Sequence, residues 1–130
     1  MTSPALETFT LEPAPGERVV GERLAGASPC YLFVHGLGSV RKGEKSTALF
    51  AHAAARGHSA LRYDQRGHGE STGTIGQVAV SELIADAGRM LDRVGPSILF
   101  GSSLGGLVRD RKSTRLNSSH SSVSRMPSSA

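Results

Sequence analysis

The chain has 130 residues, so it holds at most one domain of ordinary size. Its 38% hydrophobic content, its 16 glycines and the lack of a bilayer-spanning apolar run exclude collagen-like, wholly disordered and transmembrane classes. The first fifteen residues lack the basic and apolar segments of a signal peptide, and the single cysteine, Cys30, allows no internal disulfide. We therefore expect a cytoplasmic protein with no membrane partner.

The net charge of +4 is confined to the C-terminal segment. Residues 1–108 hold ten basic and ten acidic residues, whereas residues 109–130 hold five basic residues and one acidic residue. Eight of those last 22 residues are serine, and few are apolar, so the segment cannot bury enough surface to offset the entropy of ordering it. The sequence therefore predicts a domain over residues 1–108 and a disordered tail over residues 109–130.

The tail allows three interpretations. Its composition fits either a flexible solvated end or a basic arm that binds nucleic acid. In addition, residues 110–120 (DRKSTRLNSSH) resemble the in-frame translation of a sequencing-library adapter. On that interpretation the tail is non-native read-through that begins near Val108, and we expect no nucleic-acid partner.

Two kinds of apolar pattern predict strands. Apolar and polar residues alternate on either side of a Pro- and Gly-rich turn, which predicts an antiparallel pair over residues 6–11 and 18–24. Three short continuous apolar runs are typical of strands buried on both faces in a parallel sheet, over residues 30–34, 59–63 and 97–100.

Helical patterns separate these three runs. An alanine-rich segment over residues 45–56 ends at Gly57, which suits a helix with a glycine stop. Residues 78–94 carry apolar side chains at helical spacing, with Glu82, Asp86, Arg89 and Asp92 assigned to the opposite, polar face. Alternating strands and helices predict right-handed crossovers and an α/β fold.

The last predicted strand runs into GSSLGG at residues 101–106, which fits the pattern G-x-S-x-G with Ser103 at its centre. A strand-to-helix turn this tight needs small neighbours on both sides, and Gly101 and Gly105 supply them. Such a turn holds the Ser103 hydroxyl above the sheet edge and points the Leu104 N–H into the same space. A plain glycine-rich turn is the other interpretation of the bare pattern.

The first buried strand ends in HGLG at residues 35–38. Because parallel strands bring their carboxyl ends to one crevice, this loop and the Ser103 turn can share a site. The backbone N–H of Leu37 is then the predicted second oxyanion donor. We interpret His35 as a hydrogen-bonding group that fixes the loop rather than as a general base, and Asp64, after the next strand, as a turn-fixing carboxylate.

Together, the blocks at residues 35–38, 64–71 and 101–106 resemble the signature of the α/β-hydrolase superfamily. With Gly43 and Lys45, they lean toward its esterase, thioesterase and serine-aminopeptidase-like branches. The resemblance implies the amino-terminal half of a doubly wound, mostly parallel sheet. It also implies Ser103 as nucleophile, Leu37 and Leu104 as backbone oxyanion donors, and a structural loop of Asp64, Arg66, Gly67, Gly69 and Ser71.

In this superfamily the acid and the histidine follow the nucleophile along the chain. After Leu107 only Asp110 and His120 qualify, and both lie in the adapter-like segment. We therefore expect a chain truncated after the turn at Ser103 and inactive as given. The complete protein would be a serine hydrolase acting on an ester, thioester or amide of a small acyl substrate, with no cofactor or metal.

Two alternative functions stay open. The chain is alternatively a non-catalytic hydrolase-fold binding module or a basic-tailed nucleic-acid binder. A phosphate loop over residues 38–43 is disfavoured, because Glu44 separates Gly43 from Lys45. His52, His58 and His68 lack partners at metal-ligand spacing, so we interpret them as surface or packing residues.

Overall fold

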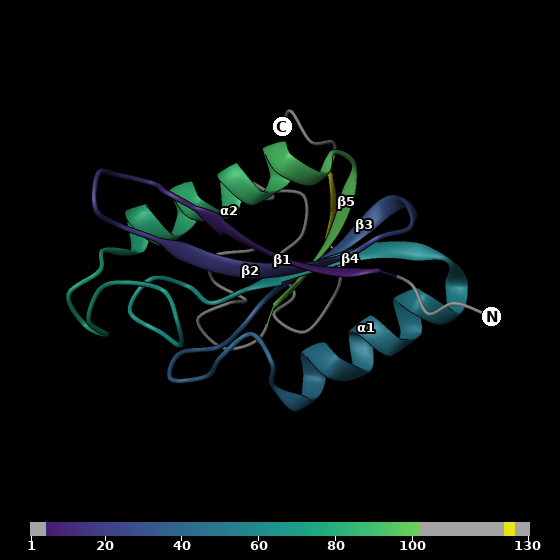
Figure 1. The fold of residues 1–130 in the computed structure, drawn as a ribbon, viewed down its shortest axis with the longest axis horizontal. Coiled ribbons are helices and arrows are strands. Elements are labelled where there is room, and N and C mark those ends of the chain that lie inside the picture. The colour runs from purple at the N-terminus through teal and green to yellow at the C-terminus, as the bar shows by residue number, and fades with distance from the viewer. Residues whose placement is uncertain (1–4, 102–123, 127–130) are drawn as a thin grey trace.

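The computed structural model describes residues 5–101 and 124–126 (Figure 1). They form one six-stranded sheet in the order β1-β2-β4-β3-β5-β6. The predicted antiparallel pair is confirmed: β1 (Leu6–Leu11) lies against β2 (Val19–Leu24), and β2 in turn pairs antiparallel with β4 (His58–Tyr63). The three buried runs form the parallel part, with β3 (Ala27–Val34) between β4 and β5 (Ser97–Gly101).

The two helices cover opposite faces of the sheet (Figure 1). Helix α1 (Glu44–Arg56) packs on one face with Leu24, Tyr31 and Ile98, and α2 (Val80–Val94) packs on the other with Leu32, Leu61 and Leu99. This is the doubly wound arrangement predicted from the alternation of strands and helices. Its parallel strands are buried on both sides, which explains their continuous apolar runs.

The element boundaries follow local chemistry. Helix α1 ends at Gly57, which has φ +74° and donates its N–H to the last turn, as the glycine stop predicts. Helix α2 begins two residues later than predicted, because Ala79 is extended and its N–H is bound by the Glu82 carboxylate at 2.9 Å. Strand β3 begins earlier than its apolar run, since Ala27 N–H donates to the Gly57 carbonyl.

Strand β6 (Ser124–Met126) lies inside the segment predicted to be disordered. It pairs antiparallel with residues 97–99 of β5. At these three residues the structure differs from the prediction, because the outer edge of β5 offers unpaired backbone groups to any strand. The other residues of the tail lie outside the described part of the chain, and the domain boundary at residue 108 stays a prediction.

Two composition-based expectations concern the described residues. None of the helices in this part of the chain has the length and apolar character needed to cross a bilayer. Cys30 is buried in β3, and burial raises the pKa of its thiol, so it is a packing residue rather than a reactive one.

The entry into β3 requires a glycine at position 26. A Cβ built there would lie 2.3 Å from the carbonyl carbon of His58 and 2.5 Å from the amide nitrogen of Ser59, both backbone atoms. We predict that Gly26→Ala lowers the free energy of unfolding by about 1–3 kcal/mol, measured by urea denaturation. Gly43→Ala is the matched control, because its Cβ would meet the Ser39 hydroxyl at an ordinary 3.5 Å. Equal losses in the two variants would contradict this explanation.

Candidate active site

The carboxyl ends of β3 and β5 lie side by side. The two strands are paired in parallel with Val34 opposite Gly101, so the loop after β3 and the first glycine of the G-x-S-x-G pattern start at the same sheet edge. This edge is where parallel α/β sheets bind ligands. Ser103 and Leu104 lie outside the described residues, and their predicted roles stay predictions.

The predicted oxyanion donor Leu37 lies in a tight turn at this edge. Ser39 N–H donates to the Gly36 carbonyl at 3.1 Å, and Gly38 has φ +79°, as the third position of a type II turn requires. The Leu37 side chain is 59% exposed. Among residues 5–101, the Leu37 N–H has no hydrogen-bond acceptor. The turn therefore presents a backbone donor that a ligand can use.

His35 fixes this loop, as predicted. It is buried, its Nε2 accepts the Gln65 N–H at 2.9 Å, and its Nδ1 lies 2.8 Å from the Gly36 carbonyl and donates to it. Gln65 also donates its side-chain N–H to the His35 carbonyl at 2.8 Å. Burial lowers the pKa of His35, with a further lowering by His68, so the ring is neutral. Both ring nitrogens are in use, which leaves His35 no lone pair for general-base work.

Asp64 is the turn-fixing carboxylate that the sequence predicted. One oxygen accepts the Arg41 N–H at 2.7 Å, and the other accepts the Arg41 guanidinium at 2.5 Å and the Glu70 N–H at 3.0 Å. The Asp64 carbonyl accepts the Ser71 hydroxyl at 2.6 Å. Gly69 has φ +51°, and a Cβ there would lie 2.3 Å from the Asp64 carboxyl carbon, so only glycine fits.

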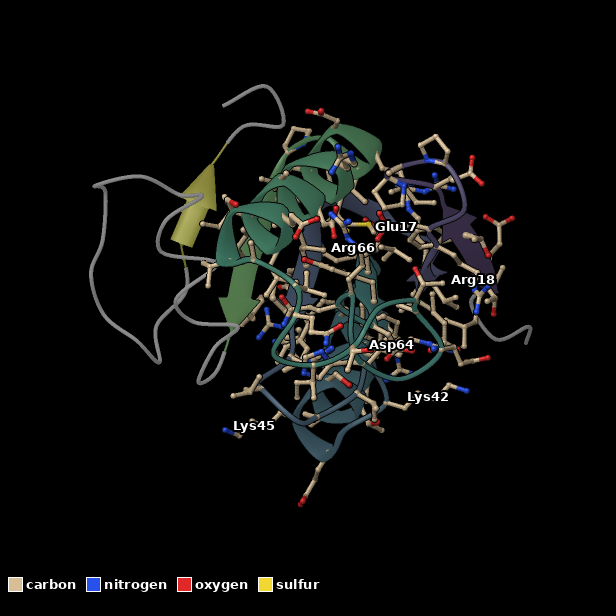
Figure 2. All side chains as sticks on the ribbon, turned by 90° about the vertical axis from the view of Figure 1, so that its left-hand side faces the viewer. Glu17, Arg18, Lys42, Lys45, Asp64 and Arg66 are labelled. Carbon is tan, nitrogen blue, oxygen red and sulfur yellow. The ribbon has the colours of Figure 1, made fainter. Side chains whose placement is uncertain are left out.

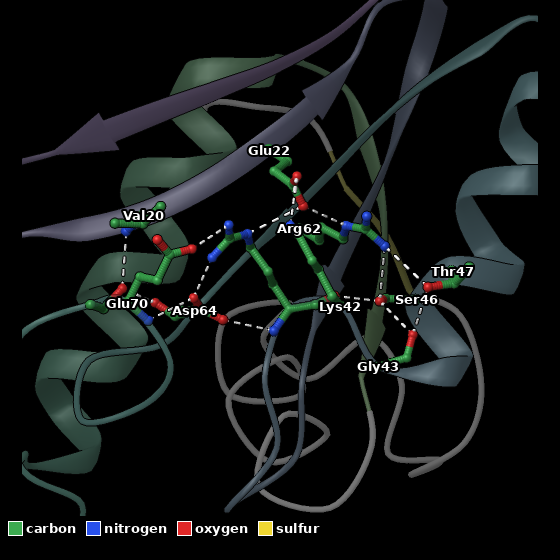
Figure 3. A network of polar contacts seen from close by, with 11 residues as sticks. Val20, Glu22, Lys42, Gly43, Ser46, Thr47, Arg62, Asp64 and Glu70 are labelled. Atoms are coloured by element: carbon green, nitrogen blue, oxygen red, sulfur yellow. Dashed lines mark hydrogen bonds and ion pairs between the residues drawn. The ribbon is translucent and has the colours of Figure 1, made fainter.

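Arg41, in the loop after β3, contacts three carboxylates. Figure 3 labels the residues that carry them, Glu22, Asp64 and Glu70. Besides Asp64, the Arg41 guanidinium contacts Glu22 of β2 at 3.2 Å and Glu70 at 2.6 Å. Burial alone would lower the pKa of Arg41, but these acidic partners outweigh burial and raise it. Arg62 of β4 adds a second cation, 3.0 Å from Glu22. This network leaves no local pattern in the sequence, because its partners lie 19 to 40 residues apart.

The same contacts argue against the phosphate-loop alternative. The one arginine in residues 38–43 is turned toward Glu22, Asp64 and Glu70, and these carboxylates would repel a phosphate group.

Arg66 anchors the loop after β4 to helix α2. It binds both carboxylate oxygens of Asp86 at 2.8 and 3.0 Å and also contacts Glu17 and Glu82, and Figure 2 shows Arg66 beside Glu17. The hydrogen bonds to Asp86 raise the pKa of Arg66. Asp86 is 0% exposed, so its assignment to the polar face of α2 is wrong. Helical spacing alone could not predict this burial, because the arginine that neutralises the Asp86 carboxylate, Arg66, lies in the loop after β4.

His52 and His58 have the predicted surface and packing roles, whereas His68 hydrogen-bonds to the backbone of another loop. His52 is exposed and accepts a hydrogen bond from Arg56, and His58 stacks on Tyr31 with ring centroids 5.3 Å apart. His68 is buried, and its Nε2 accepts the Gly38 N–H at 3.0 Å. Within the described part of the chain, no three His, Cys, Asp or Glu side chains are grouped as metal ligands.

A cavity of about 260 Å³ borders the loop after β3. Its lining combines apolar and polar groups from the end of β3, the loop and the start of α1: Phe33, His35, Gly36, Ser39, Val40, Gly43, Glu44, Lys45 and Ser46. The cavity therefore adjoins the turn that carries Leu37.

Comparison with known proteins places this geometry in a family. The family model described as "Serine aminopeptidase, S33" matches residues 27–115. Palmitoyl-protein thioesterase ABHD10, mitochondrial, of Rattus norvegicus is 37% identical over 87 residues, which are 65% of this chain and 29% of the relative. The chain thus spans less than a third of the curated relative that it matches.

Two solved structures share the fold. Alpha/beta hydrolase domain-containing protein 10 from mouse superposes with a TM-score of 0.73 and 32% identity, over 79% of this chain and 42% of that chain. The structure named "Putative hydrolase from Agrobacterium vitis S4" superposes with a TM-score of 0.74 and 27% identity, over 85% of this chain and 44% of that chain.

The Arg41 contacts predict a large effect on stability. Arg41→Met would leave the Asp64 carboxylate buried without its cation, which costs about 3–5 kcal/mol of unfolding free energy. Lys42→Met is the neighbouring control, because Lys42 is exposed and lies 3.8 Å from Glu22. Urea denaturation of both variants measures the difference. If Arg41→Met lowered the free energy of unfolding as little as Lys42→Met, the Arg41 contacts would not be stabilising the fold.

The buried His35 predicts a pH effect. The pKa of His35 in the folded chain lies below its unfolded value of 6.5. At a pH between these two values, His35 is protonated in the unfolded chain but not in the folded chain. This contribution to stability is present above about pH 6.5 and is lost as the pH falls toward the folded pKa. We expect urea denaturation between pH 8 and pH 5 to show a smaller loss in His35→Gln than in the wild type. His52→Gln, which removes an exposed histidine, should keep the wild-type loss, and parallel curves for all three proteins would refute the prediction.

Proposed function

The chain belongs to the serine aminopeptidase S33 family of α/β hydrolases, and from this premise we propose that it is the nucleophile-bearing part of a serine hydrolase. The proposed reaction cleaves an ester, thioester or amide through an acyl-enzyme on Ser103. The observation that carries the proposal is the register of β3 against β5, with Val34 opposite Gly101. Because of this register, the Leu37 turn and the G-x-S-x-G pattern both begin at neighbouring strand ends on the same edge of the sheet.

In the proposed reaction the Ser103 oxygen attacks the substrate carbonyl carbon while a histidine takes the hydroxyl proton. The N–H groups of Leu37 and Leu104 stabilise the tetrahedral oxyanion. The intermediate collapses, the bond to the leaving group breaks, and the histidine returns the proton to that group. Water, deprotonated by the same histidine, then attacks the carbonyl carbon of the Ser103 ester. The bond from that carbon to the Ser103 oxygen breaks, the histidine returns the proton to the Ser103 oxygen, and the acid is released.

The base and the acid of this reaction are not among residues 5–101. Nε2 of His35 and Nε2 of His68 each accept a backbone N–H, and the Asp64 carboxylate accepts hydrogen bonds from Arg41 and from the Glu70 N–H. Asp110 and His120 lie outside the described residues, and we do not assign them these roles. We propose that the acid and the histidine belong to a part of the protein beyond these 130 residues, so the chain itself is inactive.

The substrate class is proposed from the relatives. The rat and mouse relatives are named palmitoyl-protein thioesterases, which favours a thioester of an acyl group among the three linkages. The cavity beside the Leu37 turn offers space for part of such a substrate. The proposed chemistry uses the Ser103 hydroxyl, two backbone donors, a histidine and an acid, and it requires no metal or cofactor. A small-molecule acyl substrate and a cytoplasmic location stay predictions.

The proposal is tested on the complete gene product that carries residues 1–108. We expect its reading frame to continue past Val108 and to supply an Asp or Glu followed by a His. A fluorophosphonate probe should label this protein, and Ser103→Ala should abolish the labelling, whereas the neighbouring Ser102→Ala should retain it. Loss of an acid–base pair lowers turnover by up to about 10⁶-fold, so the 130-residue chain should not turn over nitrophenyl esters.

Two results would contradict the proposal. Labelling of the complete protein that survives Ser103→Ala would remove the nucleophile. Steady turnover by the 130-residue chain that disappears in Ser103→Ala would show that the acid and the base lie within this chain after all.

A further inference from the structure

Two buried histidines tie the loops after β3 and β4 to each other. His35, at the end of β3, accepts the Gln65 N–H of the second loop at 2.9 Å. His68, in the second loop, accepts the Gly38 N–H of the first loop at 3.0 Å. The two rings are 4.8 Å apart at their centroids. Each loop therefore supplies the acceptor for a backbone donor of the other.

These contacts fix two consecutive peptide units around Leu37. The Gly36 carbonyl accepts from His35 Nδ1 and from Ser39 N–H. Because a trans peptide is planar, a carbonyl held inward forces the Leu37 N–H of the same unit to point the opposite way. The next peptide unit ends in the Gly38 N–H, which His68 holds. Leu37 is thus clamped on both sides.

The clamp at Gly38 works only with a neutral His68. The ring donates from Nδ1 to the Arg66 carbonyl at 3.2 Å, so Nε2 carries the lone pair that accepts the Gly38 N–H. If Nε2 of His68 were protonated, its N–H would face the Gly38 N–H, and because both groups are donors this hydrogen bond would be lost. Among the described residues, His35 and His68 face each other, one from each loop, and Asp64 is the carboxylate that acts on His35.

We propose that His68 is a positioning residue for the oxyanion donor Leu37, acting through the Gly38 N–H. This inference rests on the proposed function, in which the Leu37 N–H binds the developing oxyanion. A loosened Leu37 turn would weaken transition-state binding more than substrate binding, so the loss falls on kcat rather than on KM.

The first experiment measures the contact in the 130-residue chain, where no activity is needed. His68→Gln places a carbonyl near the position of Nε2 that accepts without titrating, and His68→Ala removes the acceptor. We expect the Gly38 amide protection factor in hydrogen exchange to fall at least tenfold in His68→Ala and to be recovered in His68→Gln. In the wild type the Gly38 amide resonance should titrate together with the His68 ring, and in His68→Gln it should not titrate.

His52→Gln is the matched control, because it removes an exposed histidine from α1 and should leave the Gly38 amide unchanged. If His68→Ala does not fold, the titration of the Gly38 amide in the wild type and its absence in His68→Gln carry the test. The proposal would be overturned if the protection factor of the Gly38 amide were the same in all the variants and its resonance did not change with pH.

The second experiment uses the complete gene product. We expect His68→Ala to lower kcat at least tenfold with KM nearly unchanged, and His68→Gln to restore most of the loss. Failure of the proposed function has a different signature, because labelling would then survive Ser103→Ala while the Gly38 amide still follows His68. Unchanged kcat in His68→Ala, alongside Ser103-dependent labelling, would overturn the positioning role alone.

Discussion

The geometry of the site depends on one buried ion pair, between the Asp64 carboxylate and Arg41. Both side chains are almost fully buried, and a charge removed from water is tolerated only where every partner is in place. Asp64 therefore needs the guanidinium and the backbone N–H of Arg41 at the same time, together with the Glu70 N–H. Few arrangements of the two loops satisfy these contacts together, and the pair consequently selects one geometry for the sheet edge.

The sheet and the loops contribute to the site in different ways. The parallel register of β3 with β5 brings the loops that follow these strands close together, because both loops begin at neighbouring strand ends. It does not set the orientation of a peptide group, which depends on hydrogen bonds made after the strands end. The Arg41 contacts hold the far end of the first loop, and His35 and His68 hold the turn that carries Leu37. Apolar burial therefore brings the loops together, and buried polar contacts determine their orientation.

The predictions from sequence succeed where the signal is local. The glycine stop at Gly57 and the continuous apolar run that became β3 each follow from the conformational preferences of neighbouring residues. Asp86 shows why the rest escaped prediction: a carboxylate in an amphipathic helix is expected on the exposed face, and its burial depends on Arg66 arriving from a separate loop. The role of His68 was hidden for the same reason, because its partner at Gly38 lies 30 residues away.

His35 and His68 differ from a general base in where their lone pairs point. A general base must have a lone pair facing the substrate and must gain and lose a proton in every cycle. His35 and His68 have their lone pairs turned toward backbone N–H groups, and each would lose that contact if it were protonated. An imidazole that holds the oxyanion donor in place cannot also carry the proton of the reaction. In the proposed reaction, the histidine that carries the proton is therefore a residue other than His35 and His68, which shape the Leu37 turn.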